Sequence, residues 1–130
     1  MMDRDLAWFV AAEPKGSPRQ QEADRRLAAL VARRRARHRR QRGGEAAACL
    51  GDAIVAIDLG PEHVGRAGRL VARAVECLED LDVDGATRVS DMCVELQDAI
   101  GAQPAQTCVE MAMRSLEALL GLDVKGGVGR

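Results

Sequence analysis

Apolar residues recur along residues 45–121 with the spacing of α-helices. Four segments, 45–58, 61–80, 86–100 and 105–120, place aliphatic side chains three or four positions apart, the period of an amphipathic helix. The β-branched residues within 53–59 also suit a buried strand, but the helical surroundings favour a helix. Short links between four such segments predict an all-α fold, an antiparallel bundle of about four helices. The expected stripes are Leu50, Ala53, Ile54 and Ile57; Val64, Ala67, Val71, Ala74, Val75, Leu78 and Leu81; Val89, Met92, Cys93, Leu96 and Ile100; and Ala105, Cys108, Val109, Ala112, Leu116, Leu119 and Leu120.

A long Arg-rich helix is expected to precede this bundle, over residues 17–42. Ser17 is a suitable N-cap, Pro18 suits the first helical position, and Gln20 stands where a capping box needs its second member. We expect the helix to end at Gly43-Gly44. Its first half carries one short apolar stripe, whereas its second half is polar all round, a pattern that cannot pack into a core. The stripe consists of Leu27, Leu30 and Val31.

The two ends of the chain complete the expected organisation. Residues 1–16 form an N-terminal segment with a short helix over 4–12, which includes Trp8 and Phe9, the only aromatic residues. That pair suits either a docking peptide or a lid over one end of the bundle. Residues 45–121 form the bundle, and residues 122–130, rich in glycine, form a frayed tail.

Charge is divided unequally along the chain, although the net charge is only −1. Residues 1–42 hold twelve Lys and Arg against five Asp and Glu, whereas residues 43–130 hold seven against fifteen. The resulting charges of +7 and −8 indicate a polyanionic partner or a charged arm. The mixed charge of residues 1–5 does not fit a secretory leader, and no segment is apolar enough to cross a membrane, so a cytoplasmic protein is expected.

The basic charge is concentrated between Arg33 and Arg42, where seven of ten residues are arginine. Guanidinium groups bind phosphate bidentately, and counterion release adds affinity for nucleic acid. The segment has no aromatic residue for base stacking, so contacts with the phosphate backbone are expected. The sequence thus predicts a small non-enzymatic nucleic-acid-binding accessory or regulatory protein. The candidate contact residues are Arg33, Arg34, Arg35, Arg37, Arg39, Arg40 and Arg42.

An acidic protein surface is the alternative partner for the same arginines. The protein would then be a helical interaction adaptor or a self-assembling module, in which the basic helix engages acidic helices such as those around 76–84, including those of another copy. The sequence has only two histidines and no arrangement typical of nucleophilic or paired-carboxylate catalysis. No enzymatic activity, no cofactor and no membrane partner are therefore expected.

A third, weaker hypothesis is a calcium-responsive helical protein. The stretch from Asp80 to Asp91 resembles the EF-hand calcium loop, with Gly85 at the sharp turn. The sequence departs from the EF-hand motif in two ways. It has apolar residues at loop positions that are usually polar, and it has an aspartate at the last position, where a longer carboxylate is usual. The alternative is an acidic turn between two helices. The candidate calcium ligands are Asp80, Asp82, Asp84 and Asp91.

Four cysteines fall one in each helix of the expected bundle, at positions 49, 77, 93 and 108. Their separations match neither a zinc ribbon nor a redox pair. Each lies on or beside an apolar stripe, which favours buried free thiols that behave as small hydrophobic groups. A metal site or disulfides are the alternatives.

Overall fold

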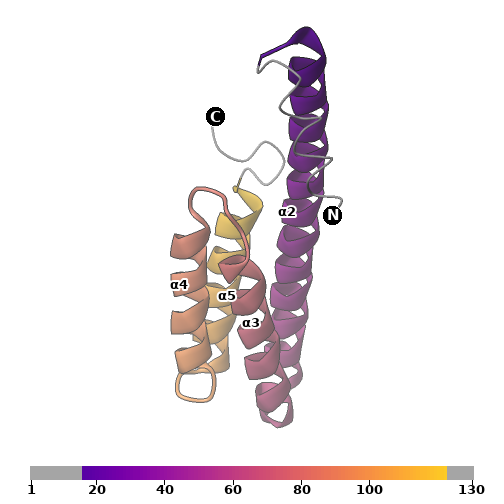
Figure 1. Ribbon diagram of the computed structural model, residues 1–130. Helices are drawn as coiled ribbons and strands as arrows, with labels where there is room; N and C mark the ends of the chain where they lie inside the picture. The colour runs from indigo at the N-terminus through magenta and orange to yellow at the C-terminus, as the bar shows by residue number, and fades with distance from the viewer. Residues whose placement is uncertain (1–15, 123–130) are drawn as a thin grey trace, which may run out of the picture. The chain divides into compact units, whose positions relative to one another are not determined.

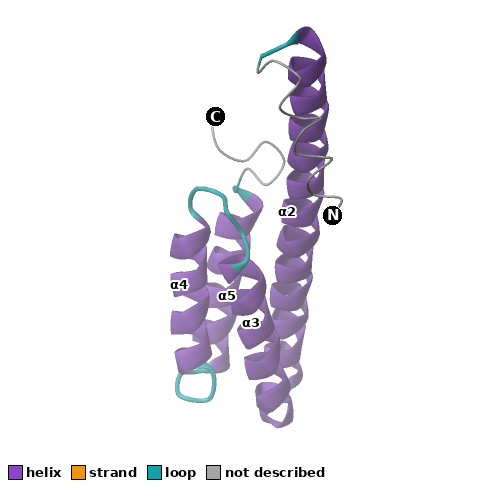
Figure 2. Ribbon diagram, viewed as in Figure 1, coloured by secondary structure: helices purple, strands orange, loops and turns teal. Residues whose placement is uncertain are grey.

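The computed structural model describes residues 16–122, which are almost entirely helical (Figure 1; Figure 2). No strand occurs among these residues, and the loops between the helices are short. The expected helix over 4–12, with Trp8 and Phe9, and the glycine-rich end of the tail lie outside the described residues. The elements are α2 (Pro18–Leu59), the 3-10 helix η1 (Pro61–His63), α3 (Val64–Glu79), α4 (Ala86–Ala99) and α5 (Ala105–Leu120).

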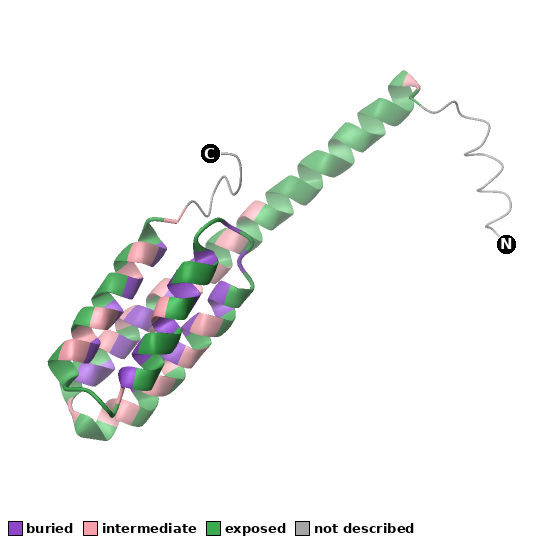
Figure 3. Cartoon of the chain, turned by 90° about the vertical axis from the view of Figure 1, so that its left-hand side faces the viewer, coloured by how far each residue is buried: buried purple, intermediate pink, exposed green. Residues whose placement is uncertain are grey.

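The chain divides into two units, Met1–Arg35 and Ala36–Arg130. In the first unit, the start of α2 is the one predicted, because the backbone N–H of Gln20 donates a hydrogen bond of 3.1 Å to Ser17 Oγ. Every residue of this unit from position 18 onward is exposed, including the short apolar stripe (Figure 3). Pairs within the helix, such as Arg26 with Glu22 at 3.0 Å, add the local support typical of solvated helices.

The second unit is the all-α bundle that the sequence predicts. The part of α2 after residue 42 packs with α3, α4 and α5 around one core (Figure 1; Figure 3). Ala and Cys are common in this core, and such small side chains let helix axes approach closely. The buried apolar residues are Ala46, Leu50, Ala53, Ala56, Ile57, Ala67, Val71, Ala74, Cys77, Leu78, Leu81, Val83, Ala86, Val89, Cys93, Leu96, Ala99, Cys108, Ala112 and Leu119.

The predicted helix end at Gly43-Gly44 is wrong, because α2 continues without interruption to Leu59. A glycine ends a helix by adopting a positive φ angle, and neither of these two glycines does so. Gly60, with a φ angle of 134°, follows the observed end instead. A glycine within a helix costs about 1 kcal/mol relative to alanine. Burial of the apolar face that follows Gly44 outweighs that cost, and the same burial makes residues 53–59 helical rather than extended.

Three positions in α5 differ from the expected pattern, and the first is Ala105, which begins the helix and is exposed. Leu120 is 69% exposed although its spacing matches the stripe, whereas Ser115 is buried. Ser115 Oγ donates a hydrogen bond of 3.0 Å to the carbonyl oxygen of Met111 one turn earlier. This bond within the helix satisfies the hydroxyl group, so a polar residue occupies a core position at little cost.

The arginine run as a candidate polyanion-binding site

The candidate site is the arginine run, which we define as the seven arginines between Arg33 and Arg42 on α2. The boundary between the two units falls within it. Arg33, Arg34 and Arg35 belong to the first unit, and the other four belong to the second. The structure separates the run into arginines that contact the bundle and arginines that do not.

Two arginines of the run are held by the loop between α3 and α4. Arg39 Nη1 lies 3.5 Å from Asp82 Oδ1, and Arg42 Nη2 lies 2.5 Å from Asp80 Oδ2. Their side chains are only 12% and 17% exposed, so their stems pack on the bundle while their charges are neutralised. These two guanidinium groups are structural and are poorly placed to bind an external anion.

Arg42 also belongs to a network of charges that joins α2 to α3. Its Nη1 donates a hydrogen bond of 2.9 Å to Glu45 Oε1, and Arg73 Nη2 donates one of 3.1 Å to Glu45 Oε2. Arg73 contacts Glu76 in turn, at 3.1 Å. The hydrogen bonds from Arg42 and Arg73 lower the pKa of Glu45, and those to Glu45 and Asp80 raise the pKa of Arg42. The network therefore fixes the charged form of each member and the geometry of the α2–α3 contact.

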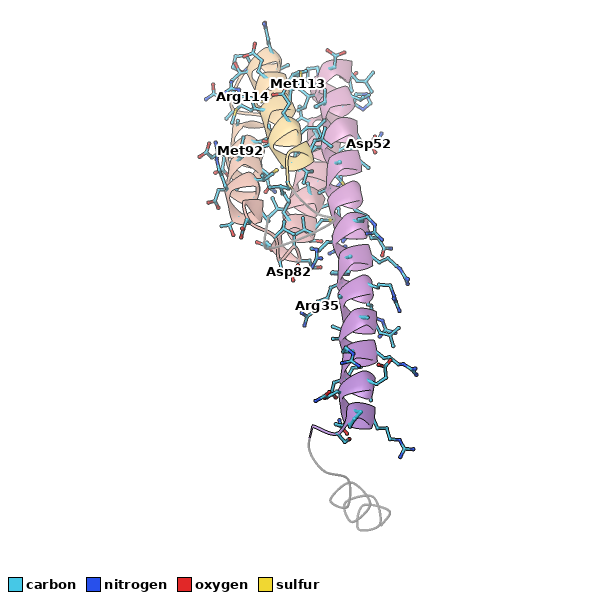
Figure 4. The ribbon with its side chains drawn as sticks, turned by 90° about the horizontal axis from the view of Figure 1, so that it is seen from above. Arg35, Asp52, Asp82, Met92, Met113 and Arg114 are labelled. Carbon is cyan, nitrogen blue, oxygen red and sulfur yellow. The ribbon has the colours of Figure 1, made fainter. Side chains whose placement is uncertain are left out.

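The other five arginines of the run are exposed and have no ion-pair partner within residues 16–122. Among residues 16–122, none of them has a hydrogen-bonded or ion-paired partner on its side chain. Figure 4 shows one of them, Arg35, extending away from the helix. Their charges remain available to an external anion, a distinction that the spacing of the arginines in the sequence could not reveal. The five are Arg33, Arg34, Arg35, Arg37 and Arg40.

The predicted calcium loop does not have the geometry of that motif. The loop between α3 and α4 is only six residues long, 80–85, and α4 begins at the seventh position. An EF-hand needs a free backbone carbonyl there, but Ala86, at that position, is already the first residue of α4, and Asp91 lies further along the same helix. Asp80 and Asp82 instead contact arginines of the run. No group of three or more His, Cys, Asp or Glu in the described part of the chain is arranged to hold a metal ion.

The four cysteines are free thiols, distributed one in each helix. Cys77, Cys93 and Cys108 are buried, and Cys49 is half-buried. Cys108 Sγ lies 3.4 Å from the carbonyl oxygen of Ala99, so the polar contact of this thiol is with the buried backbone of the bundle. Burial raises the pKa of each of the four thiols, and that of Cys93 rises to about 11. The surroundings match the interpretation of the cysteines as packing groups.

A hollow of about 250 Å³ lies at the end of the bundle where α2 meets η1 and α4 meets α5. Ile57, Val64 and Ile100 make its walls largely apolar. Among the described residues that line it, Cys108 alone is titratable, and burial raises the pKa of that thiol. The hollow offers no pair of acid and base groups.

Comparison with known proteins adds no functional clue. No protein-family model matches the chain, and neither a curated protein nor a solved structure is significantly similar to it. No helix within residues 16–122 combines the length and the apolar character that crossing a membrane requires. The functional argument therefore rests on the arginine run itself.

Proposed function

We propose that the protein is a small non-enzymatic nucleic-acid-binding accessory or regulatory protein, and that its arginine run contacts the phosphate backbone. The observation that carries this proposal is the set of five exposed arginines without an ion-pair partner among the described residues. The nearby carboxylates of the α3–α4 loop, Asp80 and Asp82, are already matched with Arg42 and Arg39. The unpaired cations repel one another, and a dense row of anions relieves that repulsion.

Phosphate suits these side chains better than other anions do. A guanidinium group presents a planar fork that fits two phosphate oxygens, and it stays charged at any physiological pH. Nucleic acid places such groups at regular short intervals and releases counterions when they are neutralised. Arg39 and Arg42 hold the C-terminal end of the run to the bundle, so their role is to position the helix rather than to bind.

Duplex DNA of random sequence, about 30 base pairs long, is the first probe. Each phosphate contact lowers the slope of log K against log[salt] by about 0.9, so five contacts give a slope of about −4.5. Replacing Arg33, Arg34 and Arg35 together with alanine should flatten the slope by about 2.7 units. Titration of labelled DNA at several salt concentrations measures both values.

A matched control removes the same charge from the bundle. The triple variant Arg66→Ala, Arg69→Ala and Arg88→Ala changes three exposed arginines outside the run, and it should keep the slope of the unchanged protein. Equal losses in the two triple variants would show that net charge alone governs binding, which would overturn the proposal.

The alternative partner is an acidic protein surface. The contacts of Arg39 and Arg42 with aspartates in the bundle favour an acidic protein partner, because these two arginines of the run already bind carboxylates. Poly-glutamate of matched charge is the probe that separates the two functions. Binding to poly-glutamate as tight as binding to DNA would favour the adaptor function and contradict the nucleic-acid one.

A further inference from the structure

One face of α2 in the first unit carries an apolar stripe with an opposite charge at each end. We name this face the N-terminal stripe. Its apolar residues recur with helical spacing and line a shallow groove along the helix. Leu27 is 61% exposed and Val31 is 38% exposed, so the described part of the chain leaves this face uncovered. The stripe consists of Asp24, Leu27, Ala28, Val31, Ala32 and Arg35.

The order of residues in the N-terminal stripe makes it complementary to itself. Asp24 lies at one end and Arg35 at the other, and neither forms an ion pair with any residue of the range 16–122. Asp24 accepts a hydrogen bond from Gln20 in its own helix, at 3.1 Å. A second copy turned by 180° about the midpoint of the stripe places its arginine opposite this aspartate, and its aspartate opposite this arginine.

The same rotation matches the sizes of the apolar side chains. Leu27 falls opposite the small Ala32 of the second copy, and Val31 falls opposite its Ala28. Large residues thus meet small ones at every level, the arrangement that allows close helix packing. A contact with twofold symmetry uses the same patch on both copies, so each favourable pair occurs twice.

We propose that the N-terminal stripe pairs two copies of this chain in antiparallel orientation. Burial of Leu27 and Val31 drives the association, and the two Asp24–Arg35 pairs set its direction and register. A parallel pair in register would instead place the two copies of Asp24 together and the two copies of Arg35 together. The stripe spans only about three helical turns, so association is expected at a protein concentration on the order of 100 µM. The proposal does not depend on nucleic-acid binding.

Sedimentation equilibrium of the full chain, without nucleic acid, tests the association. The mass should rise from 14.0 kDa toward twice that value as protein concentration increases. The double variant Leu27→Asp and Val31→Asp should stay monomeric at all concentrations. A matched control, Val55→Asp with Val94→Asp, changes two exposed valines of the bundle and should associate like the unchanged chain. An unchanged chain that stays monomeric, or a stripe variant that still associates, would overturn the proposal.

Charge variants test the orientation. Asp24→Arg alone and Arg35→Asp alone should each weaken association at least tenfold, and the variant with both changes should regain it. Asp24→Asn should weaken an antiparallel pair but strengthen a parallel one, so a gain in affinity would contradict the geometry. All these residues are exposed, so an unchanged melting temperature of the bundle shows that the variants fold. A monomer that loses melting temperature with Leu27→Asp would instead indicate that another segment of the same chain covers the stripe, which also contradicts the proposal.

Discussion

Arg42 and Asp80 are 38 positions apart in the chain, yet Arg42 Nη2 lies 2.5 Å from Asp80 Oδ2. This contact joins the last arginine of the run to the loop that follows α3. The arginine run is therefore not uniform, because its C-terminal end contacts the bundle whereas most of its charges have no partner in the described part of the chain. The structural role of Arg42 and the proposed binding role of the other arginines can be separated by experiment.

Arg42→Ala should lower the melting temperature of the bundle. The change removes the guanidinium group that contacts the Asp80 carboxylate, and it removes one of the two arginines that contact Glu45. Arg37→Ala is the matched control, since Arg37 is exposed and its side chain has no ion-pair partner among the described residues. Thermal unfolding followed by circular dichroism compares the two. Equal melting temperatures would show that the Arg42 contacts do not stabilise the fold.

Stability should depend on pH through Glu45. Arg42 and Arg73 lower the pKa of this carboxyl group in the folded chain. Its contribution is therefore fully present above the unfolded-state pKa of about 4.3 and disappears as the pH falls through the lower folded-state pKa. Glu45→Gln should lower the melting temperature at pH 7, and the difference from the unchanged chain should shrink toward pH 3. A difference that stayed constant over this range would exclude an ionic origin.

Glycines in helices and at turns should respond oppositely to alanine. An added Cβ meets nothing within 4 Å at Gly44 or Gly51, both inside α2, so each change to alanine should stabilise the fold by about 0.5–1 kcal/mol. Gly85 has a φ angle of 89°, and its added Cβ would lie 2.9 Å from Leu122 Cδ2. Gly85→Ala should therefore destabilise by about 1–2 kcal/mol or more. Urea titration measures the free energy of unfolding of all three variants. A Gly85→Ala variant more stable than the unchanged chain would contradict the turn geometry.

The thiols should react slowly in the folded protein. With a pKa of about 11, the thiol of Cys93 is only about one part in a thousand thiolate at pH 8. Cys49, the one half-buried cysteine, should react first with a chromogenic disulfide reagent, and all four should react at once in denaturant. Mass spectrometry of partly labelled protein identifies the order. Rapid labelling of Cys93 in the native state would show that the core around it opens easily.

Much of the bundle could be predicted from the sequence because burial follows helical periodicity. Leu50, Val71, Cys93 and Leu96 are fully buried at the positions where their spacing places them. Leu120 is exposed although its spacing predicts burial, because the edge of an apolar stripe depends on which neighbour covers it. The end of α2 also differs from the prediction, since Gly43-Gly44 is compatible with either a stop or a continuation of the helix.

The sequence by itself determined that the chain forms amphipathic helices, that Ser17 starts the long one, and that positive charge is concentrated between Arg33 and Arg42. These properties depend on neighbours within about one helical turn, so the linear order contains them. Only the tertiary structure decided that Arg39 and Arg42 are neutralised by the α3–α4 loop, while the other five arginines pair with no residue that the structure describes. Such pairs join residues about 40 positions apart, and their distance is set by how the helices pack.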